Sequence, residues 1–178
     1  MLNLNVKESG KKICDFKLPE HRFNELVYPP WHIVDDTYNA NPLSMTRMLE
    51  ASAEKAAHLN IPLFLILGEL YELGSKSSAF HNKIGEQIGK INPAYLLYKG
   101  NYMEQIVKGI HKNNPTFSSF AHIPENIDVI KLLSNTIFQQ KNLPRGGVIL
   151  LKGSRANKLD QIFLKIKNLL TQDKPNVL

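Results

Sequence analysis

Two short segments made almost entirely of apolar residues limit the folds open to this chain. Residues 61–67 read Ile-Pro-Leu-Phe-Leu-Ile-Leu, and residues 147–151 read Gly-Val-Ile-Leu-Leu. Such runs are typical of strands covered on both faces, as in a parallel sheet flanked by helices. Before the first of them, apolar and small residues recur at helical spacing across residues 42–59. The sequence therefore predicts an α/β fold.

The rest of the chain continues this alternation of helix and strand. We expect helices at 76–90 and 101–112, strands at 94–98 and 116–121, a helix opened by residues 124–126 that runs to 138, and a last helix carrying residues 159–170. Helices of this length between strands predict a Rossmann-like, mostly parallel sheet with right-handed crossovers. Two segments around Pro29-Pro30, residues 18–28 and 31–35, predict an N-terminal β-hairpin at one edge.

Length and composition narrow the class of protein. We interpret residues 1–17 as a flexible lead-in and residues 18–178 as one domain. The net charge is +6, but the lysines are scattered and form no dense tract, so we expect no nucleic-acid partner. The single Cys14 forms no internal disulfide, and no Cys/His spacing suits zinc. No apolar run is long enough to span a bilayer, so we expect a cytoplasmic protein without a membrane partner.

Three polar clusters each follow directly on a predicted strand. They are residues 35–41, Gly68-Glu69, and residues 152–155. The carboxyl ends of parallel strands meet at one edge of a sheet, where ligands bind. We therefore expect the three clusters to share that edge. The alternative is that each is an ordinary strand-to-helix loop rich in turn-forming residues.

Local signals at these loops predict how the next helices begin. Asn41-Pro42 reads as an N-cap followed by proline at the first helical position. Gly153 permits a tight turn, and Ser154 is expected to cap the last helix. Lys152 and Arg155 would then bring positive charge to that helix's N-terminus, which could bind an anion.

The amino-acid sequence of these clusters resembles that of the C-terminal domain of the Mur ligases. The segments that carry the resemblance are Asp35-Asp36-Thr37-Tyr38-Asn39-Ala40-Asn41-Pro42 with Ser44-Met45, residues 67–74, and Lys152-Gly153-Ser154-Arg155. Within the family, they are most similar to the branch that adds D-alanyl-D-alanine to a UDP-N-acetylmuramoyl tripeptide. The chain has Glu69-Leu70 where the family has Asp-Met, and Leu159-Asp160 where it has Met-Glu. The resemblance covers roughly residues 18–171.

The resemblance implies roles for individual residues. Arg22 would reach the ATP phosphates and Asp36 the ribose, and the residues expected to shape the amine-substrate side are Asn39, Asn41, Glu69, His81, Lys152, Ser154 and Arg155. His81 could instead orient the loop, because it lacks the partners of a catalytic triad. Arg22 could instead pair with Glu20 or Glu25. We expect no catalytic residue and no metal ligand in this chain.

One motif is missing from the sequence. No Gly-x-x-Gly-Lys-Thr loop is present to cradle a triphosphate. The resemblance implies that ATP and Mg²⁺ are held mainly by a central domain outside this chain, and a UDP-sugar by an N-terminal one. These two domains and small-molecule substrates are the expected partners. The leading hypothesis is thus the C-terminal domain of an ATP-dependent amide ligase of peptidoglycan synthesis, inactive alone. A standalone nucleotide- or dipeptide-binding module and an interaction domain of cell-wall assembly are the alternatives.

Overall fold

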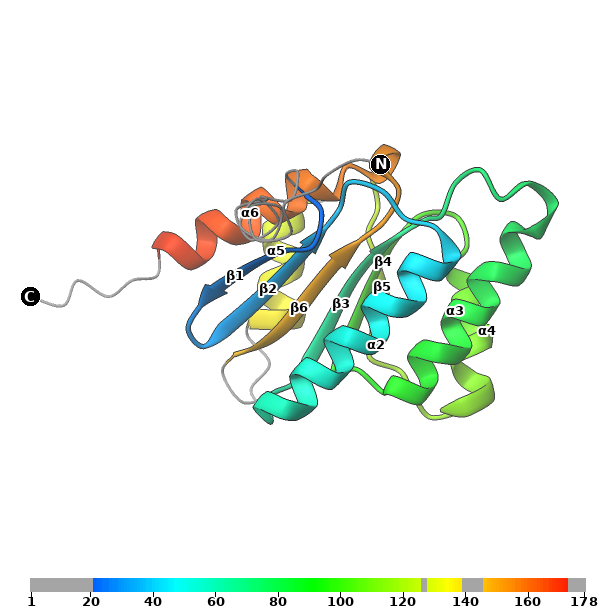
Figure 1. Cartoon of the computed structure of the whole chain (residues 1–178), viewed down its shortest axis with the longest axis horizontal. Helices are drawn as coiled ribbons and strands as arrows, with labels where there is room; N and C mark the ends of the chain where they lie inside the picture. The colour runs from blue at the N-terminus through cyan, green and yellow to red at the C-terminus, as the bar shows by residue number, and fades with distance from the viewer. Residues whose placement is uncertain (1–20, 126–127, 139–145, 173–178) are drawn as a thin grey trace, which may run out of the picture.

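A six-stranded sheet forms the centre of the computed structural model, which describes residues 21–125, 128–138 and 146–172 (Figure 1). The strand order is β1-β2-β6-β3-β4-β5. The strands are β1 Asn24–Tyr28, β2 Trp31–Asp36, β3 Leu63–Gly68, β4 Tyr95–Lys99, β5 Phe120–His122 and β6 Gly147–Lys152. β1 pairs with β2 in antiparallel orientation, and the other neighbouring pairs, β2–β6, β6–β3, β3–β4 and β4–β5, are parallel. The predicted lead-in, Cys14 and residues 18–20 of the expected hairpin lie outside the described residues.

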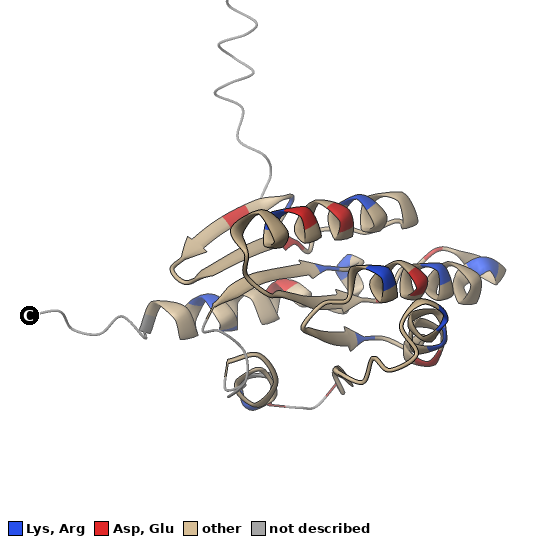
Figure 2. Ribbon diagram, turned by 90° about the horizontal axis from the view of Figure 1, so that it is seen from below, with Lys and Arg blue, Asp and Glu red and all other residues tan. Residues whose placement is uncertain are grey.

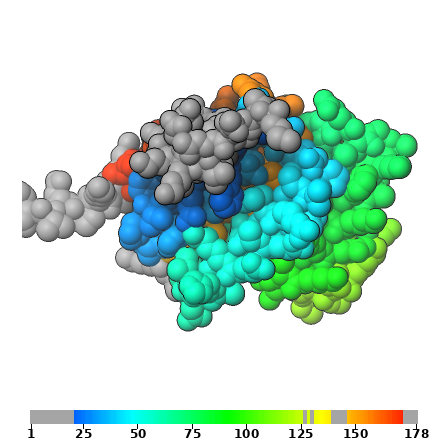
Figure 3. Space-filling view, in the orientation of Figure 1, coloured from blue at the N-terminus to red at the C-terminus, as the bar shows by residue number. Residues whose placement is uncertain are grey.

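Helices cover both faces of this sheet. They are α2 Pro42–Leu59, α3 Ser77–Ile91 and α4 Met103–Asn113 on one face, and α5 Val129–Leu133 with α6 Leu159–Gln172 on the other. Short 3-10 turns, η1 Gly74–Lys76 and η3 Arg155–Asn157, precede α3 and α6. Figure 3 shows α2 and α3 side by side over the sheet. The predicted α/β class, the mostly parallel sheet and the edge hairpin are confirmed.

The two apolar strands lie where the sequence predicted. Every residue of β3 and β6 is buried, because their side chains alternate between the hydrophobic cores on the two faces. Ile66 and Leu151 enter the core under α5 and α6, whereas Leu65 and Leu150 enter the core under α2, α3 and α4. These two strands therefore fix the middle of the sheet.

Glycines bring α3 and α4 into close contact. A methyl group at Gly85 would lie 2.1 Å from the carbonyl oxygen of Ile106, and one at Gly109 would lie 2.0 Å from the carbonyl oxygen of Asn82. Real side chains never approach a backbone so closely, so glycine is required at both positions.

Two predicted element boundaries and one predicted helix cap are wrong. β5 begins at Phe120 instead of residue 116, because the Phe117 N–H donates to the Asn114 carbonyl and turns the chain. The helix expected to open at residues 124–126 begins at Val129 and continues as a π turn, η2 Ser134–Phe138. The last helix carries residues 159–170 as predicted, but the turn η3 separates it from Ser154, so Ser154 does not cap it.

Charges of both signs are mixed along the helices (Figure 2). On α2, for example, Arg47 pairs with Glu50, and Lys55 pairs with Glu25 of β1. Within the described ranges, no helix combines the length and apolarity needed to cross a membrane.

Candidate functional site at the strand ends

The carboxyl ends of β2, β6 and β3 lie next to one another. In the sheet register, Asp36 of β2 is level with Lys152 of β6, and Lys152 is level with Leu67 of β3. The polar residues that follow these strands therefore meet at one edge. We call this edge, formed by residues 35–41, 68–71 and 152–157, the rim. The prediction that the three clusters share one edge is confirmed.

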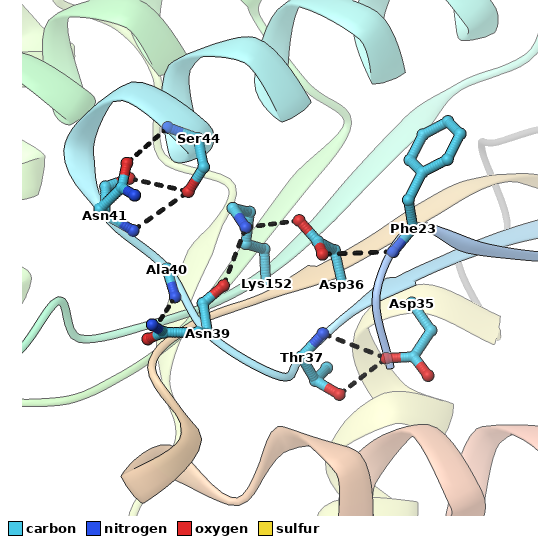
Figure 4. A network of polar contacts seen from close by, with 9 residues as sticks. All are labelled: Phe23, Asp35, Asp36, Thr37, Asn39, Ala40, Asn41, Ser44 and Lys152. Carbon is cyan, nitrogen blue, oxygen red and sulfur yellow. Dashed lines mark hydrogen bonds and ion pairs between the residues drawn. The ribbon is translucent and has the colours of Figure 1, made fainter. Parts of the chain in front are cut away.

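An ion pair joins the first and third clusters of the rim (Figure 4). The Lys152 ammonium donates to Oδ2 of Asp36 and, at 3.1 Å, to the carbonyl oxygen of Asn39. The Lys152 side chain is 1% exposed and that of Asp36 is 16% exposed. Lys152 thus links the end of β6 to the loop after β2, and does not lie at the N-terminus of α6 as the sequence suggested.

The two aspartates also fix the chain just before β1. Buried Asp35 accepts hydrogen bonds from His21 Nδ1–H at 2.8 Å and from the hydroxyl of Thr37 at 2.7 Å. Oδ1 of Asp36 accepts from the N–H of Phe23 at 3.2 Å. His21 and Phe23 have φ angles of 62° and 46°, a region that residues other than glycine seldom adopt. The backbone on both sides of Arg22 is therefore held by the two aspartates.

Asn41 begins α2 as predicted. Its side chain accepts from the Ser44 N–H at 2.8 Å, and the Ser44 hydroxyl accepts from the Asn41 N–H, a capping box with Pro42 at the first helical turn (Figure 4). The Asn39 side chain accepts from the Ala40 N–H, so both asparagines shape the loop while remaining exposed.

A second set of contacts joins the loop after β3 to the turn after β6. The hydroxyl of Ser154 accepts from the Tyr71 N–H at 3.1 Å, and the Ser154 N–H donates to the Glu69 carbonyl. Asn157, 2% exposed, donates to the carbonyls of Glu69 and Ser154 and accepts from the Glu69 N–H. A methyl group on Gly68 would lie 2.7 Å from the Asn157 amide, which explains the glycine there. Sequence reasoning missed Asn157, because a buried asparagine in a turn looks like any turn residue.

His81 of α3 also holds the loop after β3 in place. Its Nδ1–H donates to the Ser77 carbonyl at 2.7 Å, and its Nε2 accepts from the Leu70 N–H at 3.1 Å. Burial lowers the pKa of His81, which keeps the ring neutral as this arrangement requires. The side chain is 1% exposed and both ring nitrogens are bonded inside the protein. The structure therefore places His81 as a residue that orients the loop.

Glu69 is also directed inward. One of its carboxylate oxygens accepts from the Asn101 N–H at 2.8 Å, so the loops after β3 and β4 are joined. The carboxylate lies beside Gly100 and buried Tyr98. Burial, and secondarily the charge of Glu69, raise the pKa of Tyr98. Tyr98 consequently stays protonated.

A pocket of about 430 Å³ opens next to the rim, at the ends of β4 and β5. Charged and polar side chains from the ends of these two strands and from loops line it, chiefly Lys99, His122, Glu125 and Lys158. Its position on the carboxyl side of the parallel strands matches where such sheets bind ligands. Its lining was missed in the sequence, because Lys99 and His122 end short strands and Glu125 and Lys158 lie in loops, all without a recognisable motif.

Tyr38 of the rim contacts two arginines, Arg22 before β1 and Arg155 after β6. The guanidinium carbon of Arg22 lies 4.2 Å from the centre of the Tyr38 ring, and that of Arg155 lies 5.3 Å from it. Arg155 is thus placed at Tyr38 rather than at the start of α6. Among the described residues, no group of three or more His, Cys, Asp or Glu side chains is arranged to hold a metal ion.

The family of this chain follows from a match to a family model. The model of the Mur ligase, glutamate ligase domain, matches residues 21–155, which include all three clusters of the rim. The chain belongs to the Mur ligase family. The match ends before α6 and begins next to Arg22.

Curated relatives carry one shared name. The UDP-N-acetylmuramoyl-tripeptide--D-alanyl-D-alanine ligase of Haemophilus influenzae is 29% identical over 146 residues, covering 80% of this chain and 28% of the relative. The ligase of the same name from Bacillus subtilis is 29% identical over 136 residues, covering 73% of this chain and 26% of the relative. The chain thus spans under a third of the length of these two relatives.

Solved structures share the fold. A crystal structure of MurF from Acinetobacter baumannii matches 93% of this chain with a TM-score of 0.75 and 22% identity, over 34% of its own length. MurF ligase from Thermotoga maritima in complex with ADP matches 94% of this chain with a TM-score of 0.66 and 23% identity, over 36% of its own length. The Rossmann-like architecture is therefore that of one part of these larger chains.

Proposed function

We propose that this chain is the C-terminal domain of an ATP-dependent ligase of peptidoglycan precursor synthesis, which joins D-alanyl-D-alanine to a UDP-N-acetylmuramoyl tripeptide. The observation that carries the proposal is the rim: three clusters that the family model covers are cross-linked at the carboxyl ends of β2, β6 and β3. Relatives that carry this activity in their name support the substrate.

The reaction would proceed through an acyl phosphate. Transfer of the γ-phosphate of ATP to the tripeptide carboxylate activates its carbonyl carbon. The amine of D-alanyl-D-alanine attacks that carbon, and the tetrahedral species expels phosphate as the amide forms. ATP and Mg²⁺ would be held mainly by a central domain, and the UDP-sugar by an N-terminal one, both outside this chain. A cytoplasmic location suits these substrates.

Within this chain, Arg22 and Asp36 would contact the nucleotide. Arg22 is exposed and held by the strained backbone around it. Each oxygen of Asp36 already accepts one hydrogen bond, but a carboxylate offers about four lone-pair positions in all. The partly exposed carboxylate therefore retains capacity for a ribose hydroxyl.

The amine substrate would occupy the pocket beside the rim. A dipeptide carries an ammonium and a carboxylate, and the pocket offers Glu125 to the first and Lys99 or Lys158 to the second. Its volume of about 430 Å³ is in the range of small-molecule sites. Buried Glu69, His81, Lys152 and Ser154 would act by fixing the loops that form the rim, and exposed Asn39 and Asn41 by shaping its outer loop.

A chimeric enzyme tests this proposal. In the Bacillus subtilis ligase, the segment that this chain matches is replaced by this chain, and the product is detected by mass spectrometry after incubation with ATP, the UDP-linked tripeptide and D-alanyl-D-alanine. We expect the pentapeptide product from the chimera and none from the ligase lacking that segment. A folded chimera that binds its substrates but forms no product would contradict the proposal and favour a binding module. The 178-residue chain alone should neither hydrolyse ATP nor form amide bonds.

A further inference from the structure

One aromatic ring on the rim contacts two cations that are far apart in the sequence. Arg22 precedes β1 and Arg155 follows β6, yet both guanidinium carbons lie within 5.3 Å of the centre of the Tyr38 ring. Both distances are in the range of favourable cation–π contacts. Tyr38 is half-buried, whereas both arginines are exposed. The ring therefore serves as a support from which two guanidinium groups reach solvent.

Neither arginine has an anionic partner in the described part of the chain. Other basic side chains do: Arg47 pairs with Glu50, Lys112 with Glu86, and Lys152 with Asp36. The aspartates beside Tyr38 bond to other groups, Asp35 to His21 and Thr37 and Asp36 to Phe23 and Lys152, and neither forms an ion pair with Arg22 or Arg155. Two guanidinium groups that contact one ring and lack a counter-ion repel each other, and a polyanion long enough to contact both reduces that repulsion.

The backbone around Arg22 is held in place before any ligand arrives. The unusual φ angles on either side of Arg22 are maintained by the rim itself, through the bonds of Asp35 to His21 and of Asp36 to Phe23. The Tyr38 N–H donates to the His21 carbonyl at 3.0 Å, which ties the ring directly to the segment of Arg22. Such strain persists only where the surroundings enforce it, and it is concentrated at ligand sites.

We propose that Tyr38 is a positioning residue that holds Arg22 and Arg155 as one pair, and that this pair binds the phosphate groups of a polyphosphate. The proposal rests on the proposed function for the nature of the nucleotide, and it goes further by moving Arg155 from the amine-substrate side to the phosphate side. Polyphosphate fits better than a dipeptide carboxylate, because two guanidinium forks offer ten N–H donors and a single carboxylate uses only one fork.

Calorimetric titration of the 178-residue chain with inorganic tripolyphosphate tests the pair. Arg22→Gln and Arg155→Gln should each lower the association constant about tenfold, the loss expected for a charged hydrogen-bonding group. Tyr38→Leu should cause a similar loss, whereas Tyr38→Phe, which keeps the ring face, should bind within about twofold of the unchanged chain. Arg47→Gln is the matched control, since it removes the same charge from an exposed arginine on α2. Circular dichroism confirms that each variant is folded.

The proposal is overturned if Arg155→Gln or Tyr38→Leu binds tripolyphosphate as tightly as the unchanged chain. It is also overturned if Tyr38→Phe loses as much affinity as Tyr38→Leu, or if Arg47→Gln loses as much affinity as Arg22→Gln and Arg155→Gln. Competition by D-alanyl-D-alanine would also overturn it, by showing a carboxylate site. The titration requires no ligation. If the arginine variants bind tripolyphosphate as tightly as the unchanged chain while the chimera is active, this inference alone is refuted. If the variants lose binding as expected while the chimera is inactive, the proposed function alone is refuted.

Discussion

Replacing Asp36 by Asn should destabilise the domain more than its exposure suggests. In the described residues, Asp36 is the carboxylate bonded to Lys152, whose side chain is 1% exposed. Asn keeps the size of the side chain but leaves a buried cation without a counter-charge. Removing one partner of a buried ion pair costs about 3–5 kcal/mol. Because the Asp36 side chain is 16% exposed and water reaches the pair, we expect about 3 kcal/mol.

Replacing the other partner of the ion pair, Lys152, should lower the free energy of unfolding by less. Lys152→Met removes the cation and fills its volume with an apolar chain, while the Asp36 carboxylate keeps the Phe23 N–H and its access to water. We expect a loss of about 1–2 kcal/mol. The double variant should then be more stable than the sum of the two losses predicts, by about 2 kcal/mol, because it contains no uncompensated charge.

Urea unfolding followed by circular dichroism measures all three values, provided that the slope of free energy against urea stays constant among the variants. If Asp36→Asn lowers the free energy of unfolding by less than about 1 kcal/mol, the reasoning is refuted, because an unpaired buried charge should destabilise the fold by more than that. Strict additivity in the double variant would refute it as well.

Three further predictions concern the elements that support the rim. Gly85→Ala should lower the free energy of unfolding by about 2–3 kcal/mol, measured in urea, because its methyl group would meet the Ile106 carbonyl at 2.1 Å. Asn41→Ala should cost about 1 kcal/mol in the same assay, because the cap of α2 is lost. Protonation of His81 is disfavoured in the folded state, so stability should fall as the pH drops below about 6.5, by up to about 1.4 kcal/mol per pH unit. His81→Gln should lack that part of the fall.

Each of these has a contrary outcome. Gly85→Ala with unchanged unfolding would show that α3 and α4 separate easily. Asn41→Ala with unchanged stability would show that the capping box is not formed in solution. A parallel pH dependence in His81→Gln and the unchanged chain would show that His81 is protonated as readily in the folded state as in the unfolded one.

The sequence predicted the elements that depend on local pattern. The almost entirely apolar segments that form β3 and β6 predicted a sheet covered by helices on both faces, and Asn41-Pro42 predicted the start of α2. Parallel pairing then placed the three clusters at one edge by topology alone. The resemblance to the Mur ligases agreed with these expectations.

What the sequence missed depends on contacts between distant residues. Ser154 looked like a helix cap, but its hydroxyl accepts from Tyr71, and a 3-10 turn intervenes before α6. Lys152 looked like a ligand-binding cation, but it is buried against Asp36. The convergence of Arg22 and Arg155 on Tyr38 joins both ends of the domain, and no spacing in the sequence encodes it.

The most direct test of the rim as the ligand site is to map binding residue by residue. Amide chemical shifts of the ¹⁵N-labelled chain are followed during titration with ADP and, separately, with D-alanyl-D-alanine. We expect shifts at residues 21–23, 36–41 and 155 with ADP, and around Lys99, His122 and Lys158 with the dipeptide. Shifts confined to the opposite end of the strands, around Pro30, Pro62 and Gly146, would contradict it.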